Sequence, residues 1–335
     1  MKTGLFCLFE NWQDDFSLSL ADQIRLIVEA EAMGLDSAWF AEHHFNNFSV
    51  CPDPFALLGY AAAKTRGLRL GTAAVLLPFY DPVRVAESAA SIDVLSGGRL
   101  ELGFAKGAFP ADHRHFKSSP DENREVMKEG VRLVNRLLGE AGVSSEGPYF
   151  PRENITVYPR PIQAHPPIWI ATYGSDESVQ FAAENGFGII ASQAASIETL
   201  EQITARYRSI AGRTPKLAVA KVYHLGRDRQ SAIDEAMPAI DHFVRSMQAV
   251  GGFNPAMAWR LSKTPEFQQE RAKNFSGVTM AEAGLFGTAK ECLEQIRTLL
   301  QRVEIDTLML KPASPEYDKR FNDLKVYYDE IAPFI

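Results

Sequence analysis

Eight short apolar runs alternate with helix patterns along this chain of 335 residues. The runs expected to form strands are 2–9, 37–45, 68–77, 99–105, 168–172, 187–192, 216–225 and 307–311. The helices expected between and after them are 19–34, 54–65, 82–95, 121–138, 176–185, 197–211, 231–250, 289–303 and 315–331. Such alternation predicts a parallel sheet with right-handed crossovers, and the number of strands favours a closed barrel over an open sheet. We therefore predict a single (β/α)8 TIM-barrel domain over residues 1–335.

Helix boundary signals support this assignment. Asp53-Pro54 and Asp81-Pro82 each place a capping residue before a first-turn proline, and Gly34 is a natural helix end. The region 141–167 is rich in proline, glycine and aromatic residues, so we expect an excursion with short extended pieces there.

Composition narrows the class of partner. The net charge of −7 argues against nucleic acid or an anionic membrane surface as the main partner. No apolar run approaches the 18 or more residues of a membrane span. Cys7, Cys51 and Cys292 are scattered and form no CxxC pair, which is typical of a reducing cytoplasm.

The strand that begins at Ser37 ends in a polar cluster, Glu42-His43-His44. Ligands of α/β barrels lie at the carboxyl ends of the strands, so this cluster is the first candidate site. Successive side chains of a strand point to opposite faces. One histidine should therefore face the site while the other is tied into the wall, which suits acid–base chemistry better than metal binding. The alternative is that both histidines are structural.

Other strand ends carry residues suited to a flat, phosphorylated ligand. Ala73 and Ala74 are small enough for a large flat group to lie close to the backbone. Lys106 follows the fourth strand, and Ser175 and Ser178 lie where the fifth strand leads into a helix. A helix N-terminus attracts anions, so these three residues predict a site for one phosphate. Alternatively, Ser175 is only a helix cap and Lys106 a solvated charge.

Four motifs, taken in order, strongly resemble the bacterial luciferase-like flavin monooxygenases. They are Ala41–Phe45 (AEHHF), Gly71–Pro78 (GTAAVLLP), Pro82–Glu87 (PVRVAE) and Gly98–Gly103 (GRLELG). The resemblance runs from Lys2 to about Gly186 and resumes at Gly287–Cys292 (GTAKEC), so it covers nearly the whole chain.

The resemblance implies an FMNH2-dependent two-component monooxygenase. Such enzymes receive reduced FMN from a separate NAD(P)H-dependent flavin reductase, form a flavin C4a-peroxide with O2 and oxygenate a small organic substrate. By the same resemblance, His43 is the catalytic histidine, acting as general base or hydrogen-bond partner, and Glu42 orients it or lines the pocket.

The resemblance also assigns the cofactor contacts. Ala73-Ala74 falls where the family has a non-prolyl cis peptide under the flavin ring, and Lys106, Ser175 and Ser178 fall on phosphate-binding positions. Gly174 stands where a flavin-contacting glutamate is expected.

Two substitutions argue against light emission. Ala105 replaces the reactive cysteine of light-emitting luciferases, and Lys106 replaces an arginine. A lysine is a point charge and not a bidentate fork, so the grip on phosphate is expected to be looser. Hydroxylation or Baeyer–Villiger oxygen insertion is therefore the expected reaction.

Two other functions share these sequence features. One is a deazaflavin-dependent oxidoreductase that transfers hydride without O2, and the other is a non-catalytic flavin-binding protein.

Three further predictions concern regions outside the core motifs. Residues 251–287 show no clear periodicity, and we expect a mobile lid inserted after strand seven, with a packed peripheral insertion as the alternative. Phe109 and Asp112 are expected in a loop at the rim of the flavin site, whereas a metal site at Asp112–His115 lacks a convergent further ligand. Alanine-rich faces at 57–63 and 85–92 suggest a homodimer, although such faces equally suit packing within one chain.

Overall fold

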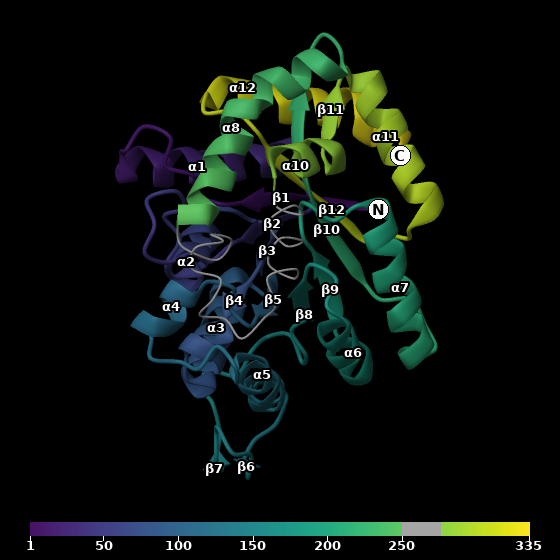
Figure 1. The fold of residues 1–335 in the computed structure, drawn as a ribbon. Coiled ribbons are helices and arrows are strands. Elements are labelled where there is room, and N and C mark those ends of the chain that lie inside the picture. The colour runs from purple at the N-terminus through teal and green to yellow at the C-terminus, as the bar shows by residue number, and fades with distance from the viewer. Residues whose placement is uncertain (250–275) are drawn as a thin grey trace.

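The fold is known from a computed structural model that describes residues 1–249 and 276–335. Eight parallel strands in these ranges follow one another around a closed barrel (Figure 1): β1 (Lys2–Cys7), β2 (Ser37–Phe40), β3 (Arg69–Thr72), β5 (Leu100–Ala105), β8 (Ile168–Thr172), β9 (Gly188–Ala191), β10 (Leu217–Leu225) and β12 (Thr307–Pro312). The barrel closes because β9 pairs with β10, and β12 pairs with both β10 and β1. The predicted TIM barrel is confirmed.

Helices surround the barrel (Figure 1). They are α1 (Phe16–Met33), α2 (Pro54–Lys64), α3 (Pro82–Ser96), α5 (Asn123–Gly139), α6 (Asp176–Asn185), α7 (Ile197–Ala211), α8 (Arg229–Ala249), α11 (Ala289–Arg302) and α12 (Tyr317–Val326). The chain then continues through η3 (Tyr327–Ile331) and η4 (Ala332–Phe334). No helix in the described ranges combines the length and apolar character needed to cross a membrane.

The predicted helix boundary signals are confirmed. Asp53 caps α2 by accepting hydrogen bonds from the backbone N–H groups of Phe55 and Ala56. Asp81 caps α3 in the same way, through the N–H of Val83. Gly34 ends α1 in the left-handed conformation, with φ of 95°.

Two segments differ from the sequence prediction, and a third agrees with it. The strand expected at 68–77 is interrupted, because Ala73 and Ala74 separate β3 from β4 (Val75–Leu76) and η1 (Leu77–Phe79) follows. The rim segment that contains Asp112 forms a short helix, α4 (Pro110–His115), with a proline in its first turn. The excursion after α5 does contain short extended pieces, β6 (Val143–Ser145) and β7 (Arg152–Ile155), which pair in antiparallel fashion.

The lid predicted at 251–287 lies mostly outside the described residues, and that part stays a prediction. Its end was wrongly expected to be irregular. Residues 277–287 form α10 (Gly277–Ala283), which Ser276 caps, and β11 (Leu285–Gly287). The strand pattern was missed because β11 has only three residues, which pair with the end of β10.

The alanine-rich faces of α2 and α3 pack within this chain. Ala61, Ala86, Ala89 and Ala90 are fully buried in the main hydrophobic core. Of the two alternatives considered for these faces, intrachain packing is therefore correct. The homodimer stays a prediction that these residues no longer support.

The amino-terminal end of the barrel, which we call the floor, is closed by two tryptophans. Trp39 and Trp169 meet edge to face with ring centroids 5.4 Å apart. A Cβ atom at Gly71 would overlap the ring of Trp39, and one at Gly188 would overlap the ring of Trp169. Glycine at these two positions therefore lets the barrel interior hold both indole rings.

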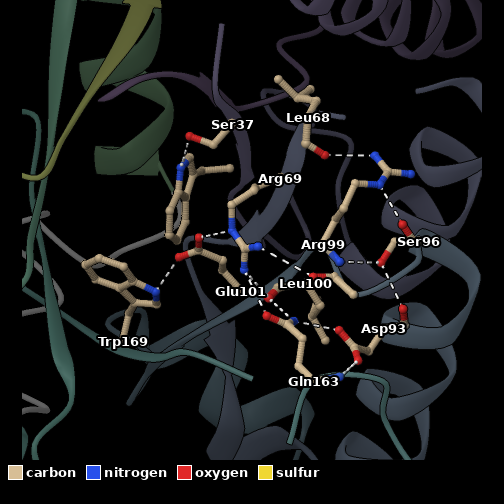
Figure 2. Close-up of polar contacts among 12 residues, drawn as sticks. Ser37, Leu68, Arg69, Asp93, Ser96, Arg99, Leu100, Glu101, Gln163 and Trp169 are labelled. Carbon is tan, nitrogen blue, oxygen red and sulfur yellow. Dashed lines mark hydrogen bonds and ion pairs between the residues drawn. The ribbon is translucent and has the colours of Figure 1, made fainter. Parts of the chain in front are cut away.

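Below the tryptophans, the floor holds a hydrogen-bonded network (Figure 2). Glu101 accepts hydrogen bonds from Trp169 Nε1 at 2.8 Å and from Arg69 Nε. Gln163 links this pair to α3, because its Nε2 donates to Asp93 at 2.6 Å and its Oε1 accepts from Arg69 at 3.2 Å. The buried charges at this end of the barrel are therefore matched by partners.

Candidate active site

The loop after β2 carries a buried pair, Glu42 and His44. His44 Nε2 lies 2.6 Å from Glu42 Oε1, and Glu42 Oε2 accepts a hydrogen bond from the backbone N–H of Leu76 at 3.1 Å. Burial raises the pKa of Glu42, while contact with His44 opposes that rise. The pair connects the loop after β2 to β4 by hydrogen bonds. His44 is therefore the histidine with the structural role.

His43 lies in a different environment from its neighbour. Its backbone N–H donates to the carbonyl of Cys51 at 3.1 Å, and its ring lies near those of Phe48 and Phe109, with centroid distances of 6.4 and 6.1 Å. The buried Nδ1 atom has no hydrogen-bond partner among the described residues. Burial is the larger cause, and the charge of His44 the smaller one, of a pKa for His43 lowered to about 4. Its imidazole is therefore neutral at pH 7.

The expected orienting role of Glu42 toward His43 is not seen, since its carboxylate contacts His44. The reason is the alternation of side chains in an extended chain, which places residues two apart on the same side. Glu42 and His44 therefore share one side of the segment.

Asp112 is a second buried carboxylate at this end of the barrel, which we call the mouth. The residue is 0% exposed, and in the described part of the chain neither carboxylate oxygen has a hydrogen-bond partner. Burial raises the pKa of Asp112 to about 6; His44 lowers this pKa by a smaller amount, and the charge of Glu42 raises it further. Phe116, at the end of α4, meets the ring of His44 at 4.7 Å. Asp112 therefore lies beside the Glu42–His44 pair.

The break between β3 and β4 has the geometry that the resemblance implied. The Ala73-Ala74 peptide bond is cis. The N–H of Ala73 donates to the carbonyl of Phe40 at 2.7 Å, which joins the break to the end of β2. The expected flavin contact of both alanines stays a prediction.

The two serines expected at a phosphate site do lie together, with a cation between them. Arg124, in the first turn of α5, donates from Nη1 to Ser175 Oγ at 3.0 Å and to Ser178 Oγ at 2.8 Å. Ser175 is also the N-cap of α6, which was the alternative role predicted for it. Glu177 competes for the same groups: its carboxylate accepts from Ser175 Oγ at 2.7 Å and lies 3.8 Å from Arg124 Nη2.

Sequence reasoning missed Arg124, although one signal was available. A cation in the first turn of a helix is disfavoured by the helix dipole, so its presence there suggests an external partner. One guanidinium, two hydroxyls and the N-terminus of α6 suit a phosphate monoester such as that of FMN. A bound phosphate would take the place of the Glu177 carboxylate.

The other predicted site residues are distributed around the mouth. Lys106 lies close enough to His113 to lower its pKa, although burial is the larger cause. Phe109 is buried beside His43, and Gly174 is exposed in the turn before α6 with φ of 133°. Roles for these three residues stay predictions.

His113 has structural partners, since its Nδ1 lies 2.6 Å from Ser118 Oγ and its Nε2 lies 3.2 Å from Asn123 Nδ2. No group of three or more potential metal ligands occurs in the described ranges 1–249 and 276–335.

The sequence matches the family described as luciferase-like monooxygenase over residues 1–307. The chain belongs to this family. It is therefore an oxidoreductase of the flavin-dependent monooxygenase class.

Known relatives share different parts of the chain. The oxygenase component of a flavin-dependent trigonelline monooxygenase from Acinetobacter baylyi is 31% identical over 56% of this chain and 53% of its own. The structure of monooxygenase RslO1 from Streptomyces bottropensis is 26% identical, with a TM-score of 0.82 over 99% of each chain. An F420-dependent secondary alcohol dehydrogenase is 20% identical, with a TM-score of 0.78 over 100% of this chain and 99% of its own. This last similarity shows a shared fold alone.

Proposed function

We propose that this luciferase-like monooxygenase is the oxygenase component of a two-component system. It would take reduced FMN from a separate NAD(P)H-dependent flavin reductase and use O2 to oxygenate a small organic substrate, by hydroxylation or by Baeyer–Villiger insertion. One observation carries the proposal: of two adjacent histidines, His44 is held by Glu42, whereas His43 has a buried ring nitrogen without a partner in the described residues.

His43 acts in this proposal as a hydrogen-bonding residue and not as a strong base. A ring with a pKa of about 4 does not hold an added proton at neutral pH. A neutral imidazole can donate one hydrogen bond and accept another, which suits it to hold a proton beside the reacting group. The surrounding rings of Phe48 and Phe109 would keep water away from this nitrogen.

The cofactor would be anchored at a distance from the chemistry. Arg124, Ser175 and Ser178 would bind its phosphate, and Ala73-Ala74 would lie against its ring. The flavin, when bound, supplies the activation of oxygen. The chain supplies position, exclusion of water and the proton held at His43.

The relative from Acinetobacter supports a separate reductase, because its name describes an oxygenase component. Nothing in that name fixes the substrate of this chain. The partner proposed here is therefore defined by its chemistry, as a supplier of reduced FMN.

The decisive experiment is an anaerobic mixing experiment. Purified protein with chemically reduced FMN is mixed with oxygenated buffer, and flavin absorbance is followed by stopped flow. We expect a long-lived species between reduced and oxidised flavin, and a decay at least 100-fold faster in His43→Ala than in the wild type. His165→Ala changes an exposed histidine and serves as the matched control. Reoxidation at the rate of free FMN, with no such species, would contradict the proposal.

A deazaflavin-dependent hydride transfer is the second candidate, because the barrel is shared with an F420-dependent dehydrogenase and the fold alone does not separate the two functions. This function predicts that the protein leaves the reaction of reduced FMN with O2 no different from that of free FMN. The stopped-flow record, compared with that of free FMN, therefore separates the two functions in the same samples.

A further inference from the structure

A row of aromatic rings leads away from His43 along the mouth. The ring centroid of Phe48 lies 6.4 Å from that of His43 and 5.2 Å from that of His242, a residue of α8. Trp12 is in the loop after β1, and its ring centroid lies 4.8 Å from that of His242. The loops after β1 and β2 are held together here, because the N–H of Asn11 donates to the carbonyl of Phe48 at 2.8 Å. The indole of Trp12 is thus connected to His43 through two intervening rings.

Trp12 and His242 each contain a buried nitrogen without a partner. Neither Trp12 Nε1 nor His242 Nε2 makes a hydrogen bond to any described residue. Buried polar atoms are nearly always satisfied, since an unmade hydrogen bond costs free energy. Two such atoms on adjacent rings are close enough for one ligand to satisfy both.

The charges beside these rings are balanced. Lys311 Nζ lies 2.9 Å from Glu10 Oε1 and 5.2 Å from the ring centroid of Phe243, and both ends of the ion pair are buried. Burial lowers the pKa of His242, so its ring is neutral at pH 7. An anionic or cationic ligand would have to disrupt this pair, whereas a neutral ligand would leave it intact.

We propose that Trp12 and His242 form a substrate subsite for a neutral aromatic compound that carries a hydroxyl group. The hydroxyl oxygen would accept the Trp12 indole N–H, and the hydroxyl proton would be donated to His242 Nε2. The aromatic ring of the compound would pack beside Phe48, on the side toward His43. This inference rests on the proposed function, because it assigns the substrate class of the same site.

Two isosteric probes test the subsite. Binding of 2-naphthol and of 2-methylnaphthalene to the full chain with oxidised FMN is measured by equilibrium dialysis. The two compounds have similar shapes, and only the first can form both hydrogen bonds. We expect the wild-type protein to bind 2-naphthol at least tenfold more tightly than 2-methylnaphthalene.

Trp12→Phe and His242→Phe each remove the nitrogen and keep an aromatic ring. Each should weaken 2-naphthol binding about tenfold and leave binding of 2-methylnaphthalene unchanged. His165→Phe makes the same change at an exposed position and should alter neither. Equal affinity of the wild-type protein for the two probes, failure to bind 2-naphthol, or equal losses for both probes in the variants would overturn the subsite.

The stopped-flow experiment separates this inference from the proposed function. Failure of the flavin species to form in the wild-type protein, together with a clear 2-naphthol preference, would refute the oxygenase and retain the subsite. Formation of the flavin species without a 2-naphthol preference would support the oxygenase and refute the subsite.

Discussion

At the floor of the barrel the Glu101 carboxylate has a hydrogen-bond donor on each oxygen, whereas at the mouth the Asp112 carboxylate has none among the described residues. Both side chains are buried, and both belong to the region of β5 and the segment that follows it. The difference lies in what surrounds them. Arg69 and Trp169 both donate to Glu101, and Gln163 accepts from Arg69. The Glu42–His44 pair beside Asp112 is instead satisfied by its own contact and by the N–H of Leu76.

This contrast separates groups that stabilise the fold from groups placed for ligands. In α/β barrels, stability residues gather at the amino-terminal end and active sites at the carboxyl end of the strands. A polar atom that is buried without a partner destabilises the protein unless a ligand satisfies it. His43 Nδ1, Asp112, Trp12 Nε1 and His242 Nε2 lack partners in the described ranges, and all four lie in segments at the mouth.

The largest expected effect is at the floor. Glu101→Ala would leave the Arg69 guanidinium and the Trp169 indole without their acceptor, and we expect the free energy of unfolding to fall by about 3–5 kcal/mol. Urea denaturation measures this loss. Glu140→Ala breaks an exposed ion pair with Arg136 and should cost at most about 1 kcal/mol. Equal losses of unfolding free energy in the two variants would show that the Glu101 network stabilises the fold no more than an exposed ion pair does.

The next effect concerns the pH dependence of stability at the mouth. Because the folded pKa of Asp112 is raised to about 6, its contribution to stability is present at low pH and is lost as pH rises from about 4 to 6. The lowered pKa of His43 gives the opposite slope over a similar range. Asp112→Asn removes the first slope, so its stability relative to the wild type should rise by about 2–3 kcal/mol between pH 4 and 7. Urea unfolding at several pH values measures this difference, and a constant difference would refute the assignment.

Arg124 offers a test at the side of the mouth. Arg124→Ala should weaken FMN binding roughly 10- to 100-fold, because it removes charged hydrogen bonds to the phosphate worth about 1.5–3 kcal/mol. Riboflavin, which lacks the phosphate, should bind equally to the variant and the wild type. Fluorescence titration gives both affinities, with Arg114→Ala as a control at an exposed arginine. Lys106→Ala in the same assay shows whether that lysine also contributes.

The smallest effect distinguishes a helix cap from a ligand contact. Ser175→Ala removes the N-cap of α6 and should cost about 1 kcal/mol of stability, together with a measurable loss of FMN affinity. Ser196→Ala removes the corresponding cap of α7 and should cost a similar stability with no change in FMN affinity. Identical behaviour of the two variants toward FMN would leave Ser175 with a capping role alone.

Much of this molecule was determined by local sequence. The alternation of strand and helix patterns gave the barrel, and Asp53, Asp81 and Gly34 marked helix boundaries, because these signals act through neighbouring backbone atoms. The motif resemblance also gave the family and the position of the cis peptide at Ala73-Ala74.

Only the tertiary structure decided which buried polar atoms have partners. His43 and His44 are adjacent and chemically identical in the sequence, yet only His44 has a carboxylate partner. Arg124 is 51 residues away from Ser175, and Trp12 and His242 are separated by most of the chain. Such pairings depend on how distant segments pack around the barrel, and no local pattern encodes the distance between them. The sequence thus determined the architecture and the end of the barrel that carries the chemistry, while packing decided which side chains there remain available to a ligand.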